Sequence, residues 1–136
     1  MGRVLGVDYG ERRIGLALSD PLHWFAFPFR TLTNEGVEKV VKTLKAIIEE
    51  QDVEQVVVGL PKGMKNQETP QTRKVLEFVT YLEQQGIPVL MEDERLSSVS
   101  ARRALQERKI KTGHAKGLVD RTAAAIVLQQ YLDRTC

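Results

Sequence analysis

Three acidic residues, far apart along the chain, are the first candidates for chemistry: Asp8, Glu94 and Asp120. Carboxylates brought together repel one another, and at least one would stay protonated unless a cation lies among them. A set made only of oxygen donors favours Mg²⁺ or Mn²⁺. Two such ions about 3.5–4 Å apart can hold the attacking and leaving oxygens of a phosphodiester. These residues therefore indicate metal-dependent hydrolysis of phosphodiester bonds, with the three acids as catalytic and metal-binding groups.

Each acid also has a simpler interpretation. Asp8 could open a turn by bonding to its own backbone. Asp120 could cap the last helix and interact with the helix dipole. Glu94 could form a surface ion pair with Arg95 or Arg121. If all three of these simpler interpretations held, the acids would have no catalytic role. The alternative hypothesis is therefore a non-catalytic protein that binds nucleic acid through its basic residues.

Apolar periodicity predicts the elements that must position the three acids. The pattern gives strands at residues 4–7, 14–18, 23–32, 53–60 and 87–91, and helices at 37–48, 70–85, 99–108 and 118–132. Asn34 is expected to cap the first helix, and Thr69 the second. Three antiparallel strands, continued by parallel strands through right-handed crossovers, give a mixed five-stranded α/β sheet of order 3-2-1-4-5 with helices on both faces.

This arrangement would place the acids at one edge of the sheet. Strand one is central, so its carboxyl end, at Asp8, lies beside the carboxyl ends of strands four and five. Ala124, Val127 and Tyr131 follow Asp120 by four, seven and eleven residues and share its side of the helix. If that apolar side covers the sheet, Asp120 faces the sheet too.

Length and composition indicate a single domain over residues 1–136. Hydrophobic residues make up 42% of the chain and charged residues 28%, which is typical of a globular protein. No apolar stretch approaches the roughly 20 residues that span a bilayer, and no signal peptide is evident. The single cysteine, Cys136, excludes an intrachain disulfide and a cysteine-based zinc site. We therefore expect a cytoplasmic protein without a membrane partner.

Basic residues are unevenly distributed, although the net charge is only +2. Residues 102–121 include seven basic and two acidic residues and carry +5, so the rest of the chain carries −3. Such a stretch suggests a phosphate-bearing partner, although it could also be a solvated face. Its middle part, 109–117, has two glycines and no periodicity and predicts a basic loop. The candidate nucleic-acid contacts are Arg12, Arg13, Lys62, Lys65, Asn66, Arg95, Lys109, Lys111 and Lys116.

The aromatic residues are expected to serve packing. Trp24, Phe25, Phe27 and Phe29 are assigned to the core by default, with a sheet edge or a dimer surface as the alternative. Tyr9 could stack on a base, but packing is the preferred interpretation.

Several stretches together resemble the YqgF/RuvX family of Holliday junction resolvases, which have a ribonuclease H-like fold. They are 6–10 with 13–17, 59–61, 93–97, and 116–120 with Ala123 and Ala124. They occur in family order and span nearly the whole chain. The resemblance implies metal-dependent nuclease activity with Asp8, Glu94 and Asp120 as the acidic positions.

The same resemblance implies two substrates, the four-way DNA junction and the 5′ end of the small-subunit ribosomal RNA precursor. Cutting a junction on two strands would favour a homodimer. The resemblance is also the main reason to prefer Glu94 to Asp93, since adjacent residues leaving a strand point opposite ways and only one can face the other acids.

The sequence departs from other junction resolvases of this fold at the end of strand four. Those enzymes carry a glutamate there, whereas this chain reads Gly-Leu-Pro at 59–61, so Glu94 from the neighbouring strand would have to substitute. A sugar-kinase or actin-like ATP-binding protein also begins with a similar Val-Asp-x-Gly loop. That architecture needs two such lobes, and 136 residues provide one.

Overall fold

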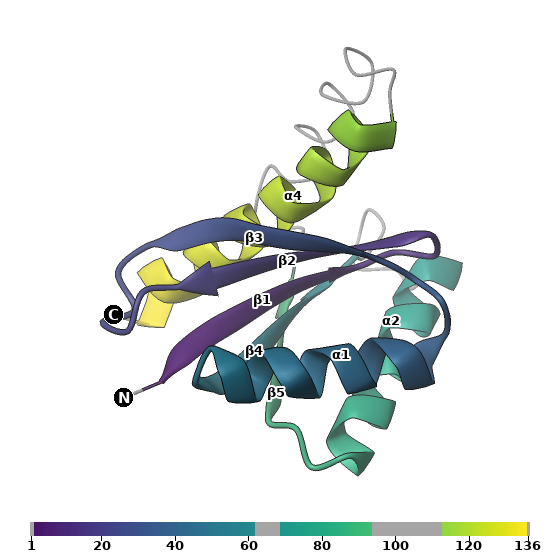
Figure 1. Cartoon of the computed structure of the whole chain (residues 1–136), viewed down its shortest axis with the longest axis horizontal. Helices are drawn as coiled ribbons and strands as arrows, with labels where there is room; N and C mark the ends of the chain where they lie inside the picture. Colours follow the sequence, from purple (N-terminus) through teal and green to yellow (C-terminus); the bar gives the residue numbers. More distant parts are fainter. Residues whose placement is uncertain (1, 62–68, 94–112, 136) are drawn as a thin grey trace.

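The computed structural model describes residues 2–61, 69–93 and 113–135. In chain order the elements are β1 (Arg3–Tyr9), β2 (Arg13–Ser19), β3 (Ala26–Thr33), α1 (Val37–Glu50), β4 (Val53–Leu60), α2 (Pro70–Gln84), β5 (Val89–Asp93) and α4 (Gly113–Thr135) (Figure 1). The helix predicted at 99–108 lies outside the described residues. Within the described ranges, no helix combines the length and the apolar character needed to cross a membrane.

The five strands form one sheet in the order β3-β2-β1-β4-β5. β2 is antiparallel to both β1 and β3, whereas β4 is parallel to β1 and to β5. Strand β1 is therefore central, and its carboxyl end shares an edge of the sheet with those of β4 and β5. The predicted strand order and mixed pairing are confirmed.

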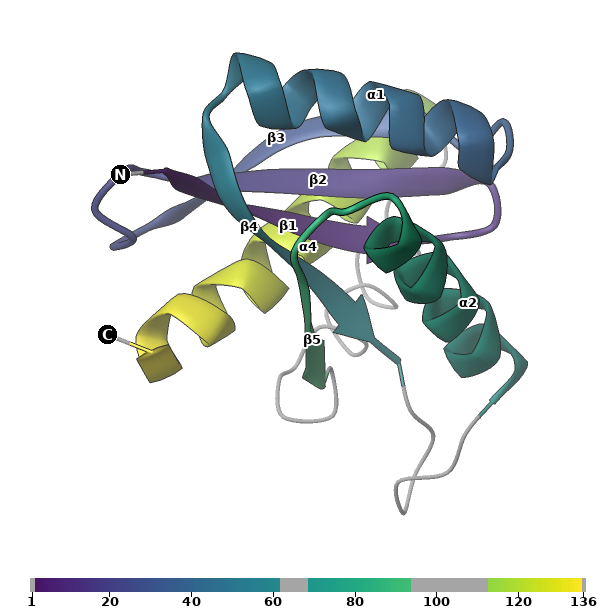
Figure 2. The same ribbon diagram turned by 90° about the horizontal axis from the view of Figure 1, so that it is seen from below.

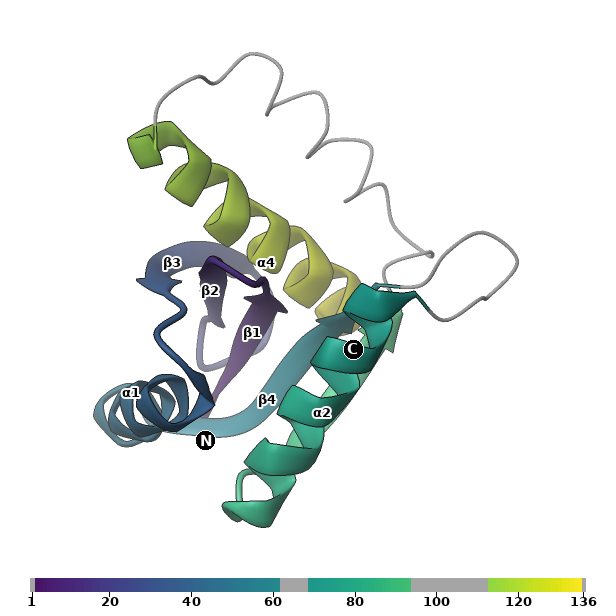
Figure 3. The same ribbon diagram turned by 90° about the vertical axis from the view of Figure 1, so that its right-hand side faces the viewer.

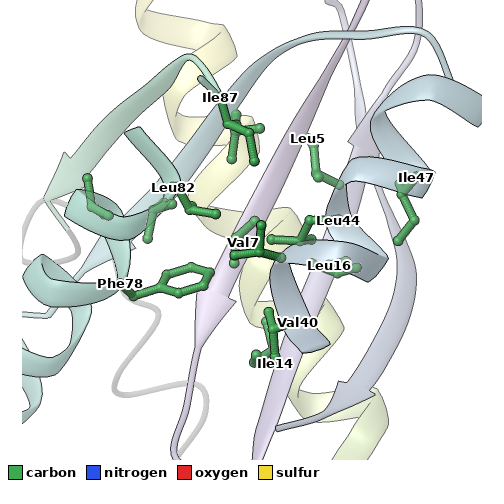
Figure 4. Packing of buried hydrophobic residues seen from close by; sticks show 14 of the residues in the cluster. Leu5, Val7, Ile14, Leu16, Val40, Leu44, Ile47, Phe78, Leu82 and Ile87 are labelled. Carbon is green, nitrogen blue, oxygen red and sulfur yellow. The ribbon is translucent and has the colours of Figure 1, made fainter. Parts of the chain in front are cut away.

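Helices cover both faces of the sheet, as predicted, with α1 and α2 on one side and α4 on the other (Figure 3). The larger core lies between the sheet and α1 and α2 (Figure 4). Its most buried members include Leu5, Val7, Ile14, Leu16, Val40, Leu44, Phe78 and Leu82. Each side chain of this size favours folding by about 1.5–3 kcal/mol when it leaves water, so this face anchors the sheet.

On the other face, α4 runs obliquely across the strands (Figure 2). The buried residues between them are Val4, Ala17, Val57, Ala124, Ala125, Leu128 and Leu132. The helix hydrogen bonds to Thr31 in β3 and to Glu92 in β5. It therefore connects the two edge strands of the sheet.

Helix α2 begins as predicted, whereas α1 does not. Thr69 is the N-cap of α2, and its side chain accepts a hydrogen bond from the Thr72 N–H. Helix α1 has Gly36 at its N-cap, without a side-chain cap. The Asn34 side chain instead accepts from the Gly36 N–H and donates to the Gly10 carbonyl oxygen. The expectation that Asn34 caps α1 is wrong because its amide joins the β3–α1 connection to the β1–β2 turn.

Helix α4 begins earlier than the sequence predicted. The pattern gave a loop over 109–117 and a helix from 118, but the chain is helical from Gly113. The carbonyl oxygen of Gly117 accepts a hydrogen bond from the Thr31 hydroxyl at 2.5 Å, which fixes this part of the helix to β3. Tertiary contact thus overrides the low helix propensity of glycine.

Most aromatic residues of the β2–β3 region stay outside the core. Trp24, Phe25 and Phe27 are 65%, 60% and 54% exposed, so the expectation of core packing is wrong for these three. Strand β3 is an edge strand, and fewer neighbouring elements are available to cover its side chains. Phe29 does pack partly against the larger core.

Candidate active site

Asp8 lies near the end of β1 with its side chain toward α4. A Cβ at Gly6, two residues earlier, would lie 2.9 Å from the Leu128 Cβ of α4, so Gly6 and Asp8 share that face. Asp8 is 6% exposed and lies within β1, one residue before the strand ends at Tyr9. The adjacent Tyr9 points to the other face and stacks on Phe78, with the ring centroids 4.2 Å apart, which confirms its packing role.

Asp120 lies inside α4 rather than at its end. The helix already begins at Gly113, so the interpretation of Asp120 as a helix cap is wrong. Asp120 is 8% exposed and lies on the same buried side as Ala124 and Val127, as predicted. A carboxylate this buried is costly to desolvate unless a cation or hydrogen-bond donors compensate it.

Gly15 of β2 brings Asp8 and Asp120 together. It lies directly opposite Asp8 in the antiparallel β1–β2 ladder, so the two residues share a face. A Cβ at Gly15 would overlap the carbonyl oxygen of Asp120 and lie 2.7 Å from the backbone nitrogen of Arg121. Only glycine allows α4 this close to β2. The two acids therefore occupy neighbouring positions between the sheet and α4.

Arg13, two residues before Gly15, contacts Asp120 directly. Its Nε–H donates to Oδ2 of Asp120 at 2.5 Å, and the two side chains are 32% and 11% exposed. Arg121 donates instead to the Thr31 hydroxyl oxygen at 3.2 Å. The sequence predicted Arg13 as a nucleic-acid contact, and its ion pair with a candidate catalytic acid is a role that sequence reasoning missed.

The register of β5 places Asp93 apart from the other acids. Asp93 pairs with Leu60 of β4, and Leu60 belongs to the core beneath α1 and α2. Paired residues of parallel strands share a face, so Asp93 lies on the opposite face from Asp8. This register argues against Asp93 as the third acid, and Glu94, the preferred candidate, lies outside the described residues.

Glu92 is a buried acid that the sequence analysis did not single out. It is 1% exposed and pairs with Gly59, so it faces α4. Its carboxylate accepts hydrogen bonds from the Gln130 amide and the Arg134 guanidinium. Strand alternation could have shown that Glu92 and Asp93 face opposite sides, but no local pattern indicates partners in a helix some 40 residues later.

The carboxyl end of β4 offers no acid to this edge of the sheet, as the sequence indicated. Gly59 faces α4, and Leu60, the last residue of the strand, faces the opposite core. Among the residues that the structure describes, no three His, Cys, Asp or Glu side chains lie close enough to hold a metal ion. A third acidic ligand for Asp8 and Asp120 would have to come from elsewhere in the chain.

The predicted nucleic-acid contacts are only partly within the described ranges. Arg12 is exposed in the β1–β2 turn, and Lys116 lies near the start of α4. The contacts outside the described residues are Lys62, Lys65, Asn66, Arg95, Lys109 and Lys111.

Comparison with known proteins decides the family. The sequence model of RuvX, described as Holliday junction resolvase, matches residues 2–134. The chain belongs to the RuvX family. A relative from Clostridium kluyveri is 42% identical over 133 residues, which cover 97% of each chain. A relative from Acetivibrio thermocellus is 43% identical over 134 residues, covering 96% of this chain and 95% of the relative, and both are provisionally named pre-16S rRNA nuclease.

RuvX membership agrees with the likeness to solved structures. Thermus thermophilus RuvC in complex with Holliday junction substrate superposes with a TM-score of 0.59 at 16% identity, covering 98% of this chain and 95% of RuvC. The large terminase nuclease of the thermophilic phage G20c gives a TM-score of 0.56 at 16% identity, covering 91% and 80%. These structures support the ribonuclease H-like fold, and RuvX membership places the chain in a nuclease family.

Proposed function

We propose that this chain is a divalent-metal-dependent endonuclease in which Asp8, Glu94 and Asp120 are the catalytic and metal-binding acids. The observation that carries the proposal is the close approach of α4 to Gly15, which puts Asp120 beside Asp8 on one face of the sheet. Glu94 completes the set because it follows β5, whose carboxyl end borders the same edge of the sheet.

The residues present suit a hard divalent cation. Asp8 and Asp120 are both buried carboxylates, and the cationic guanidinium of Arg13 lies against Asp120. Oxygen donors of this kind favour Mg²⁺ or Mn²⁺. When bound between the acids, such ions supply Lewis-acid stabilisation of the attacking and leaving oxygens of a phosphodiester.

The chain itself supplies position and charge. The rigid β1–β2 ladder and the close-packed α4 hold Asp8 and Asp120 in place before any ligand arrives. Arg12, exposed in the neighbouring turn, and the basic residues 109–116 are suited to hold backbone phosphates. A phosphodiester would thus approach the acids from the solvent, at the carboxyl ends of β1, β4 and β5.

The substrate we propose is structured nucleic acid: the 5′ end of precursor 16S ribosomal RNA, a four-way DNA junction, or both. The provisional names of the close relatives support the first, and the family description supports the second. Resolving a junction requires cuts on two strands, which a homodimer would provide, and we place the enzyme in the cytoplasm, where precursor RNA is processed.

The experiment that tests this proposal compares both substrates with one preparation of the full chain. A labelled precursor RNA with its 5′ extension and a synthetic four-way junction are incubated with Mn²⁺, with Mg²⁺ or with EDTA. We expect cleavage of at least one substrate with a divalent ion and none with EDTA. Binding of both substrates without cleavage under any of these conditions would instead support the non-catalytic binding protein.

A further inference from the structure

The ion pair between Arg13 and Asp120 puts a fixed positive charge inside the candidate active site. The Nε–H of Arg13 donates to Oδ2 of Asp120 at 2.5 Å. Arg13 lies on β2, two residues from Gly15, and therefore faces α4 together with Gly15. Gly15 lies opposite Asp8 in the β1–β2 ladder, so Arg13 belongs to the face on which both buried acids lie, and its guanidinium contacts Asp120.

The positive charge of Arg13 offsets the unfavourable electrostatics of the two buried acids. Two carboxylates that are 6% and 8% exposed repel one another and are poorly hydrated, so a nearby cation lowers their energy. A guanidinium supplied by the chain does this without any bound ion. It does so, however, by occupying Oδ2 of Asp120, an oxygen that a divalent ion at this site would need.

We propose that Arg13 is a positioning residue that holds Asp120 in the protein without a divalent ion and gives up this contact when the ion binds. The inference rests on the proposed function, since it assigns the divalent ion to Asp8 and Asp120. It makes Arg13 a competitor of that ion. Arg13 is 32% exposed, so its side chain has room to move toward solvent when it is displaced.

The competition determines whether a substitution of Arg13 raises or lowers the affinity for Mn²⁺. A hydrogen bond to a charged group contributes enough that its loss changes an equilibrium constant by about tenfold. Arg13→Gln removes both the contact and the charge, so Mn²⁺ should bind about tenfold more tightly than to the unchanged protein. A purely structural role for Arg13 would give the opposite result, because Asp120 would lose its orientation and Mn²⁺ would bind more weakly.

The test is titration calorimetry of the full chain with Mn²⁺, without nucleic acid. Arg12→Gln is the matched control, because it removes the same charge from the adjacent, exposed residue of the β1–β2 turn. We expect Arg12→Gln to change the Mn²⁺ affinity by less than about twofold, the size of a screened surface effect. Arg13→Lys retains the charge, so its Mn²⁺ affinity should stay within about threefold of that of the unchanged protein. This variant separates the effect of the charge from that of the shape of the side chain.

A second measurement needs no substitution. Magnetic resonance of the unchanged protein can follow the Arg13 Nε–H signal as Mg²⁺ is added, and the proposal expects this signal to shift and exchange faster with water as Mg²⁺ saturates. A signal that is unaffected at saturation overturns the proposal, as does an Mn²⁺ affinity of Arg13→Gln equal to or weaker than that of Arg12→Gln. The metal site of the proposed function fails as well in two cases: if the unchanged protein binds no Mn²⁺, or if Asp8→Asn binds Mn²⁺ as tightly as the unchanged protein does.

Discussion

Gly15 and Asp120 are in contact through their main chains, and this contact determines where the second acid of the candidate site lies. A side chain at Gly15 would overlap the Asp120 carbonyl oxygen. The same glycine pairs with Asp8 across the β1–β2 ladder. One residue without a side chain thus lets the part of α4 that carries Asp120 approach the strand pair that carries Asp8, although the two acids are remote in sequence.

Gly15→Ala should therefore impair catalysis more than folding. The methyl group must push α4 away from β2, which we expect to cost about 1–3 kcal/mol of unfolding free energy, as over-packing does. Because the displacement also moves Asp120 away from Asp8, cleavage should fall by about 100-fold or more. Urea denaturation and cleavage rates on one preparation would measure both effects.

The matched control for this change is Gly117→Ala. A Cβ there would meet its nearest neighbours, Thr31 and Arg121, at 3.6 Å, which is ordinary contact. Alanine in a helix is more favourable than glycine by about 0.5–1 kcal/mol, so this variant should be slightly more stable and fully active. Equal activity of the two variants would contradict the role assigned to Gly15.

Neutralising the acids separately tests the composition of the site. Asp8→Asn, Glu94→Gln and Asp120→Asn should each reduce Mn²⁺-dependent cleavage by about 100-fold or more, while circular dichroism shows a folded domain. Asp93→Asn is the control, because Asp93 faces the opposite side of the sheet and should leave cleavage within about threefold. Full activity of any of the first three variants would remove that residue from the site.

Glu92 and Arg134 should be energetically coupled. Arg134→Met leaves an oxygen of the buried Glu92 carboxylate without its donor, which should cost about 1–3 kcal/mol of unfolding free energy. Adding Glu92→Gln removes the buried charge and should recover at least about half of that loss. A double-mutant cycle by urea denaturation measures the coupling, and strictly additive effects would show that the pair contributes nothing beyond its separate members.

Lysines 111 and 116 should govern the salt dependence of nucleic-acid binding. If each contacts a phosphate, Lys111→Ala and Lys116→Ala should each reduce the slope of log affinity against log salt by about one unit. Lys39→Ala is the control, since Lys39 lies on α1 and pairs with Glu35 at 3.2 Å. Slopes that match this control would place residues 109–116 away from the bound nucleic acid.

The sheet was predictable because its strands carry strong local signals. Continuous apolar runs such as 4–7 and 56–60 are typical of strands covered on both faces, and the strands that contain them, β1 and β4, are neighbours in the interior of the sheet. The chain order of strands and helices then left few topologies open. The convergence of Asp8 and Asp120 followed from that topology and from the helical spacing of Ala124 and Val127.

The features that could not be predicted from the sequence depend on contacts between residues that are distant in the chain. The N-terminal turns of α4 read as a loop because glycine lowers helix propensity, and their anchor, Thr31, is far away in sequence. Asn34 has the residue type of a helix cap, but its amide bonds to Gly10 across a turn. Arg13 was predicted to bind phosphate for the same reason, because its partner Asp120 is distant in sequence and comes near only in the folded chain.

Helix α4 is fixed at one edge of the sheet through Thr31 and at the other through Glu92, and Asp120 lies between these anchors. The helix therefore ties β3 and β5, the two edge strands, to one element that crosses the face of the sheet. The position of Asp120 over the sheet thus depends on an element attached to both β3 and β5, so a substitution at Thr31 or Arg134 would bear on the candidate site from a distance.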